Sequence, residues 1–262
     1  IMGPPGTGKT HRLVHHYLNE EINNLHTDPQ KIAYVTFTKA AALDGSKKVQ
    51  DVFPGVELLY ISTLHAMGTR ELDISRKQIL TGTKWIQFKN VYPVYSDINF
   101  DSYVNEHGVT INQDRNLQVI NYSRAKLITL EKACIDLNYH EGAVDIFRVQ
   151  QLERDIEYYK GQKNMYEFSD MIKLFVDEEK HLALDAIFLD EAQDLNPSQW
   201  KMFFYIEALC KRSYIAGDDD QTIFKFQGAE SNIFIDLEGE RDDQEQSYRV
   251  PKAVHEQALK IL

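Results

Sequence analysis

The chain has 262 residues, of which 43% are hydrophobic and 26% charged, and its formal net charge is −11. This composition fits one large or two smaller globular domains, and the negative charge argues against a surface that is basic all over. No apolar run approaches the roughly 20 residues that cross a bilayer and no signal peptide is visible. The two cysteines are far apart and give neither a disulfide framework nor a zinc pattern, so we expect a cytoplasmic protein.

The first feature along the chain is a glycine-rich loop, GPPGTGKT, at residues 3–10. Its glycines let the backbone curl around a polyphosphate, Lys9 supplies a charge for the outer phosphates, and the Thr10 hydroxyl is a ligand for Mg²⁺. A helix predicted from Thr10 through Leu18 adds its N-terminus to the anion site. A Gly/Pro turn of no chemical meaning is the weaker alternative. We therefore predict nucleoside triphosphate binding by Gly3, Gly6, Thr7, Gly8, Lys9 and Thr10.

Only Ile1 and Met2 precede this loop, and the chain does not begin with Met. A phosphate-binding loop normally follows a buried strand. We therefore expect most of the first strand to be missing and the chain to be a piece of a longer protein.

Four short β-branched and aromatic runs are typical of strands buried in a parallel sheet: residues 31–38, 57–62, 186–189 and 212–216. Helical stretches separate them, and polar residues follow each run. This alternation predicts a doubly wound α/β domain with its site at the carboxyl ends of the strands. Residues 71–163 do not fit it. Helical spacing at 118–135 and 141–159 predicts a mainly helical insertion there.

The acidic motif LDEAQD follows the third of these runs. Asp190, at the strand end, can hold Mg²⁺ beside the phosphate loop, and Glu191 is then placed to orient or deprotonate the attacking water. The alternative is a helix that starts with acidic residues. The loop upstream favours the catalytic interpretation.

The motif GDDDQTIF follows the fourth run. The neutral amide of Gln221 can touch a γ-phosphate or its attacking water. Phe224 and Phe226 are two residues apart, so an extended segment puts them on one side. They are either core residues or stacking platforms for bases.

Together these motifs resemble the first half of a superfamily 1 helicase of the UvrD/Rep/PcrA type. The resemblance covers the chain outside residues 71–163 and holds in order, spacing and content. The matching segments are GPPGTGKT for motif I, TFTKAAA (36–42) for motif Ia, STLH (62–65) for motif Ib, LDEAQD for motif II, GDDDQTIF with FQGA (226–229) for motif III, and QSYR (246–249) for motif IV. It implies a RecA-like parallel sheet flanked by helices, with ATP and Mg²⁺ as cofactors and single-stranded DNA as partner.

The resemblance also implies roles for single residues. Lys9 and Thr10 hold phosphates and Mg²⁺, Asp190 supports the metal and Glu191 is the base. Gln221 senses the γ-phosphate, Tyr248 stacks on adenine and Arg249 reaches the γ-phosphate. On the nucleic-acid side, Phe37, Phe224 and Phe226 contact bases, while Thr38, Thr63 and His65 lie along the backbone.

The chain also departs from the family pattern. Gln227 stands where the family usually has Arg, and motifs V and VI lie beyond the last residue. We expect residues 1–70 and 164–240 to form the motor domain, 71–163 an inserted subdomain, and 241–262 the start of a second motor domain or a linker. The chain alone is then a weak or inactive ATPase, whereas the full-length protein is a helicase or translocase that moves 3′ to 5′. Two alternatives stay open: a small-molecule P-loop kinase or ATPase, and an ATP-binding regulatory module of a repair or defence complex.

Overall fold

A four-stranded parallel sheet organises the fold in a computed structural model that describes residues 1–104, 110–112, 114–139, 142–218 and 225–244. The strand order is β2 (Tyr60–Thr63), β1 (Ile32–Thr36), β5 (Ala186–Asp190) and β6 (Arg212–Ile215). All three pairings are parallel, and Thr36 of β1 is in register with both Thr63 and Asp190. The four predicted strand runs are confirmed. Their carboxyl ends meet at one edge of the sheet.

The residues before the glycine-rich loop extend this sheet beside β6. Met2 forms parallel bridges with Gly217 on one side and Asp243 on the other. The Gly217 amide donates to the Ile1 carbonyl at 3.1 Å, and the Gln244 amide donates to the Met2 carbonyl at 2.7 Å. The loop therefore starts from extended backbone at the same edge where β5 ends.

Helices cover both faces of the sheet. On one face lie α1 (Lys9–Arg12), the π-helical turns η1 (Leu13–Leu18) and η2 (Glu20–Asn24), and α2 (Lys39–Val52). On the other lie α3 (Leu64–Glu71), α8 (Phe168–Asp177), α9 (Pro197–Glu207) and α10 (Ser231–Ile235). Alternate residues of β1 and β5 serve the two cores, as expected for side chains with a period of two. Tyr34 and Phe188 point to the first face, whereas Val35 and Leu189 point to the second.

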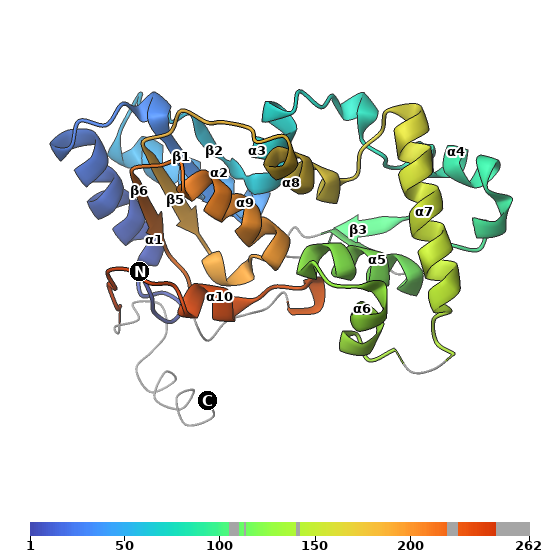
Figure 1. Cartoon of the computed structure of the whole chain (residues 1–262). Helices are drawn as coiled ribbons and strands as arrows, with labels where there is room; N and C mark the ends of the chain where they lie inside the picture. Colours follow the sequence, from blue (N-terminus) through green and yellow to red (C-terminus); the bar gives the residue numbers. More distant parts are fainter. Residues whose placement is uncertain (105–109, 113, 140–141, 219–224, 245–262) are drawn as a thin grey trace.

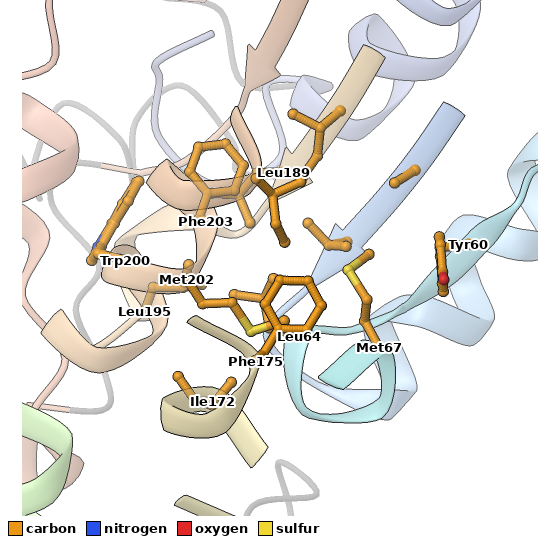
Figure 2. Close-up of a cluster of buried hydrophobic side chains, with 14 of the residues drawn as sticks. Tyr60, Leu64, Met67, Ile172, Phe175, Leu189, Leu195, Trp200, Met202 and Phe203 are labelled. Atoms are coloured by element: carbon orange, nitrogen blue, oxygen red, sulfur yellow. The ribbon is translucent and has the colours of Figure 1, made fainter. Parts of the chain in front are cut away.

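The second face holds the larger core. Side chains from α3, α8 and α9 converge there on Leu189, and Trp200 and Phe203 of α9 are almost fully buried (Figure 2). Two helices of this face begin with good caps. Thr63 accepts from the Ala66 amide at the start of α3, and Asn196 and Gln199 form a capping box at the start of α9.

Residues between α3 and α8 pack around a core of their own, centred on Phe88, Leu152 and Tyr159. The elements between α3 and α8 are η4 (Arg76–Gln78), α4 (Thr83–Val91), η5 (Pro93–Tyr95), β3 (Ser102–Val104), β4 (Thr110–Asn112), α5 (Arg115–Lys126), α6 (Leu130–Asp136) and α7 (Ile146–Lys163), and the core is formed by residues of α4 to α7 and the segments next to them. Figure 1 shows α4 to α7 grouped to one side of the sheet. The two strands pair with each other, and neither joins the four-stranded sheet. The domain boundaries stay a prediction.

Three details of this region differ from the helical spacing of the sequence. The antiparallel pair β3–β4 is an addition to a mainly helical prediction. The predicted helix 118–135 is two helices, because Leu127 is left-handed and the Thr129 hydroxyl caps a new helix by accepting from the Lys132 amide. The helix predicted over 141–159 is α7, which begins only at Ile146, where the Asp145 carboxylate caps it.

Helix α5 connects this region to the rest of the chain. Its Arg124 forms ion pairs with Glu153 and Glu157 of α7 and with Glu167, which caps α8. Two residues later Lys126 pairs with Glu230, just after the short helix η7 (Lys225–Gln227). The region therefore contacts the segment that follows β6.

No helix among the described residues has the length and apolar character needed to span a membrane. Cys134 and Cys210 are both free thiols.

Candidate functional site

The glycine-rich loop is tightly folded at the edge of the sheet. Gly6 and Gly8 have φ angles of 74° and 91°, which favour glycine. The Thr7 hydroxyl is buried and donates to the Pro4 carbonyl at 2.9 Å. A Cβ atom at Gly3 would lie 2.3 Å from the Gln244 carbonyl oxygen, so no larger residue fits there. Glycine therefore suits Gly3 because the Gln244 backbone lies close, and it suits Gly6 and Gly8 because of their positive φ angles.

The helix after the loop is present, but it differs in type from the expected α-helix. It begins as α1 at Lys9 and continues as π-helical turns from Leu13. Leu13, Val14 and Leu18 are fully buried against the sheet. Single π-turns are frequent near functional sites, and this segment contains an unusually long run of them.

Lys9 is buried and its ammonium group lies within the loop. It donates to the carbonyls of Gly3 at 2.6 Å and Pro4 at 3.1 Å. The Asp218 carboxylate, just after β6, is 3.8 Å away. The cation is thus placed between the loop and the carboxyl end of a neighbouring strand.

Thr10 and Asp190 join the loop to the end of β5. The Thr10 hydroxyl donates to Asp190 Oδ2 at 2.8 Å, and the fully buried Tyr34 hydroxyl donates to the same oxygen at 2.7 Å. The Glu191 amide donates to Oδ1 at 3.1 Å. Burial, together with the neighbouring Glu191 charge, raises the pKa of Asp190, and these three donors lower it in part.

Glu191 is held by Gln193. Glu191 has a left-handed backbone, with φ 58°, directly after the strand. The Gln193 amide donates to Glu191 Oε2 at 2.8 Å, and its carbonyl oxygen accepts from the Asp218 amide at 2.9 Å. Gln193 is 3% exposed. One buried side chain thus links the carboxylate predicted to be the base to the segment after β6.

Asp194 adds a further carboxyl group to those of Asp190, Glu191 and Asp218 at this edge. Burial first, and then the charges of Glu191 and Asp218, raise its pKa to about 7. Its Oδ1 atom has no hydrogen-bond partner among the described residues. Several carboxyl groups therefore lie close together at this edge, near the buried Lys9.

The described residues predicted to contact nucleic acid lie in the bend after β1, at the end of β2, in α3 and in η7. Phe37 is half-buried and packs against the larger core, and Phe226 in η7 is 49% exposed. The Thr38 and Thr63 hydroxyls accept from helix amides at 3.1 and 3.2 Å. Each oxygen acts as an N-cap; Thr63 is buried, at 7% exposure, whereas Thr38 is half-buried.

His65 is close to the exposed ring of Phe168, at 6.4 Å between ring centroids. Burial lowers the pKa of His65 to about 4. A neutral imidazole donates a hydrogen bond to a phosphate but adds no positive charge to a backbone contact.

Four predicted site residues lie outside the described residues: Gln221, Phe224, Tyr248 and Arg249. Their roles stay predictions. The sequence patterns did not single out Tyr34 or Gln193. The only available signal for Gln193 was its place within LDEAQD, and nothing in the pattern of β1 marked Tyr34.

The donor set fits Mg²⁺ together with a nucleotide. Proteins usually hold this ion through one or two oxygen ligands, with phosphates and water supplying the rest. Thr10 and Asp190 offer a hydroxyl and a carboxylate 2.8 Å apart. Among the residues that the structure describes, no group of three or more His, Cys, Asp or Glu side chains has metal-binding geometry, so a closed protein cage is not formed there.

The family assignment follows from the whole sequence. The profile of the UvrD/REP helicase N-terminal domain matches residues 1–242. The chain belongs to this family. The α/β fold with its four-stranded parallel sheet and flanking helices is the RecA-like architecture predicted for it.

Curated relatives agree with this assignment at a distance. The ATP-dependent DNA helicase PcrA of Bacillus subtilis (strain 168) is 27% identical over 289 residues, covering 100% of this chain and 37% of the relative. The ATP-dependent DNA helicase Rep of Buchnera aphidicola subsp. Baizongia pistaciae (strain Bp) is 25% identical, covering 90% of this chain and 36% of the relative. The chain thus spans little more than a third of the length of these helicases.

Proposed function

We propose that this chain is the nucleotide-binding motor domain of an ATP-dependent DNA helicase or translocase. The observation that carries the proposal is the hydrogen bond from Thr10 to Asp190, which joins the glycine-rich loop to the end of β5. In a chain of this family, that contact supports a shared site for the phosphate-binding and acidic motifs. The relatives are named as ATP-dependent DNA helicases.

Within this proposal, each described side chain has a chemical task. The loop and Lys9 would bind the polyphosphate, and Lys9 would move from the loop carbonyls to the outer phosphate oxygens. Thr10 and Asp190 would hold Mg²⁺, which supplies charge neutralisation at the phosphates. Glu191, oriented by Gln193, would accept the proton of the attacking water. Gln221, Tyr248 and Arg249 would complete the site as γ-phosphate sensor, adenine platform and arginine finger.

The nucleic-acid side of the proposal rests on the exposed side chain of Phe226 and on the residues at the carboxyl ends of β1 and β2. Phe226 and Phe37 would stack on bases, and the hydroxyls of Thr38 and Thr63 would donate to the DNA backbone. A second motor domain would close over the nucleotide and drive single-stranded DNA past these residues, 3′ to 5′. Residues 71–163 would form the inserted subdomain, and residues 241–262 would lead to the second motor domain.

The test is the steady-state rate of ATP hydrolysis by the full-length protein without nucleic acid, with single-stranded DNA and with single-stranded RNA. We expect DNA to raise the rate, and Lys9→Ala to abolish it because the variant loses the charge that Lys9 would bring to the outer phosphates. An unchanged rate with DNA would favour a small-molecule kinase or ATPase. ATP binding without turnover would favour a regulatory module, and stimulation by RNA alone would overturn the assignment of DNA.

A further inference from the structure

We propose that Tyr34 is a positioning residue whose hydroxyl fixes the Asp190 carboxylate for its metal-supporting role. This inference rests on the proposed function, because it assigns a task to a neighbour of the magnesium site. Asp190 Oδ2 accepts two hydroxyl hydrogen bonds, from Thr10 at 2.8 Å and from Tyr34 at 2.7 Å. Thr10 belongs to the phosphate-binding motif, whereas Tyr34 lies in the middle of β1.

The sheet register brings Tyr34 to this position. Tyr34 pairs with Phe188, two residues before Asp190, and both lie on the face covered by the helix that follows the loop. The Tyr34 side chain therefore reaches along the sheet to the carboxylate at the strand end. A shorter side chain at this position would leave that oxygen with Thr10 alone.

Two contacts hold the ring in place. Tyr34 stacks on Phe188, with 6.4 Å between ring centroids and 16° between ring planes. On its other side, a Cβ atom at Gly45 of α2 would lie 2.7 Å from Tyr34 Cε1. The glycine thus lets α2 approach the ring closely. Tyr34 is fully buried as a result, and its hydroxyl is directed at Asp190.

The chemistry of the pair points to positioning of a metal ligand. The donors to Asp190 that the structure shows are neutral: two hydroxyls and one backbone amide. Neutral donors stabilise a carboxylate and set its orientation without competing for its charge. Such supporting hydrogen bonds around a metal ligand typically contribute roughly 10- to 100-fold in metal affinity.

The chain supplies a matched control in Tyr214. Tyr214 stacks on the other side of Phe188, at 4.6 Å, and is in register with it on β6. Its hydroxyl also donates to a carboxylate, Glu21 Oε1, at 2.8 Å, but that residue lies in η2. Tyr34→Phe and Tyr214→Phe thus each remove one hydroxyl–carboxylate bond from the same row of rings.

The experiment measures equilibrium binding of a fluorescent ADP analogue to the full-length protein, with and without Mg²⁺. For Tyr34→Phe we expect the gain in affinity on adding Mg²⁺ to fall roughly 10-fold, with Mg²⁺-free affinity unchanged. Tyr214→Phe should keep the wild-type increase in affinity on adding Mg²⁺, although its melting temperature should fall about as much as that of Tyr34→Phe. Electron paramagnetic resonance can measure how tightly Mn²⁺ binds together with ADP. We expect Mn²⁺ to bind more weakly to Tyr34→Phe than to the wild type or Tyr214→Phe.

The outcomes separate this inference from the proposed function. A Tyr34→Phe variant that keeps the full Mg²⁺ gain overturns the positioning role of Tyr34. If Tyr34→Phe and Tyr214→Phe reduced the Mg²⁺-dependent increase in ADP affinity equally, the effect would come from packing of the rings. That result would also overturn the positioning role of Tyr34. A wild-type protein whose nucleotide affinity does not respond to Mg²⁺ would instead contradict the proposed magnesium site itself.

Discussion

The Gln193 side-chain amide donates a hydrogen bond to the Glu191 carboxylate at 2.8 Å. Glu191 has a left-handed backbone directly after β5, and this hydrogen bond holds its side chain. The same side chain accepts from the Asp218 amide after β6. Movement of the segment after β6 therefore has a direct route to the residue that we propose as the base.

We predict that Gln193→Ala lowers the DNA-stimulated kcat by roughly 10- to 100-fold, because a misdirected base loses the near-attack geometry. The KM for ATP should change little, since the residues proposed to bind phosphate and metal are untouched. Gln199→Ala is the matched control: Gln199 is also 3% exposed, but it caps α9. Loss of activity in the control alone, or a rise in KM without a change in kcat, would contradict the positioning role.

Phe226→Ala should weaken single-stranded DNA binding by about 1–3 kcal/mol through loss of base stacking. The ring is 49% exposed, so the melting temperature should stay close to wild type. A core phenylalanine would instead cost roughly 3–5 kcal/mol of stability. Phe147→Ala, at an exposed position on α7, is the control that should change neither quantity. Unchanged DNA affinity in a folded Phe226→Ala variant would exclude this ring as a base platform.

The lowered pKa of His65 predicts a dependence of stability on pH. Its folded pKa is about 4, against about 6.5 for an unfolded histidine. Between these values the unfolded chain binds a proton that the folded chain does not, so the free energy of unfolding falls as the pH falls. From pH 7.5 to pH 5 this amounts to about 2 kcal/mol. Urea titrations at both pH values should show a smaller decrease in the free energy of unfolding for His65→Gln than for the wild type. Equal decreases in the two proteins would contradict the lowered pKa.

The sequence was sufficient for the parts of the fold that local pattern controls. Short apolar runs located β1, β2, β5 and β6, and the motifs GPPGTGKT and LDEAQD predicted Mg²⁺ ligands at Thr10 and Asp190, whose side chains are hydrogen-bonded at 2.8 Å. The break between α5 and α6 was not predicted, because the apolar periodicity continues through Leu127 although the Thr129 cap starts a new helix. The short β3–β4 pair was not predicted either, since strands of three residues show little hydrophobic periodicity.

The supporting side chains of the site could not be predicted in the same way. Tyr34 reaches Asp190 only because β1 and β5 pair in one register and Gly45 leaves room for its ring. Gln193 bridges two strand ends that are distant in sequence. Both relationships depend on cross-strand geometry, which residue order alone does not contain.

The most direct test of the proposed motor activity is ATP turnover by the full-length protein in single-stranded DNA, with wild type and Glu191→Gln measured side by side. The variant keeps the loop, Lys9, Thr10 and Asp190, so its ATP affinity should stay near wild type. It loses only the group that accepts the proton of the attacking water, so its stimulated turnover should fall at least about 100-fold. A Glu191→Gln protein that hydrolyses ATP at the wild-type rate in the presence of DNA would contradict the proposed site.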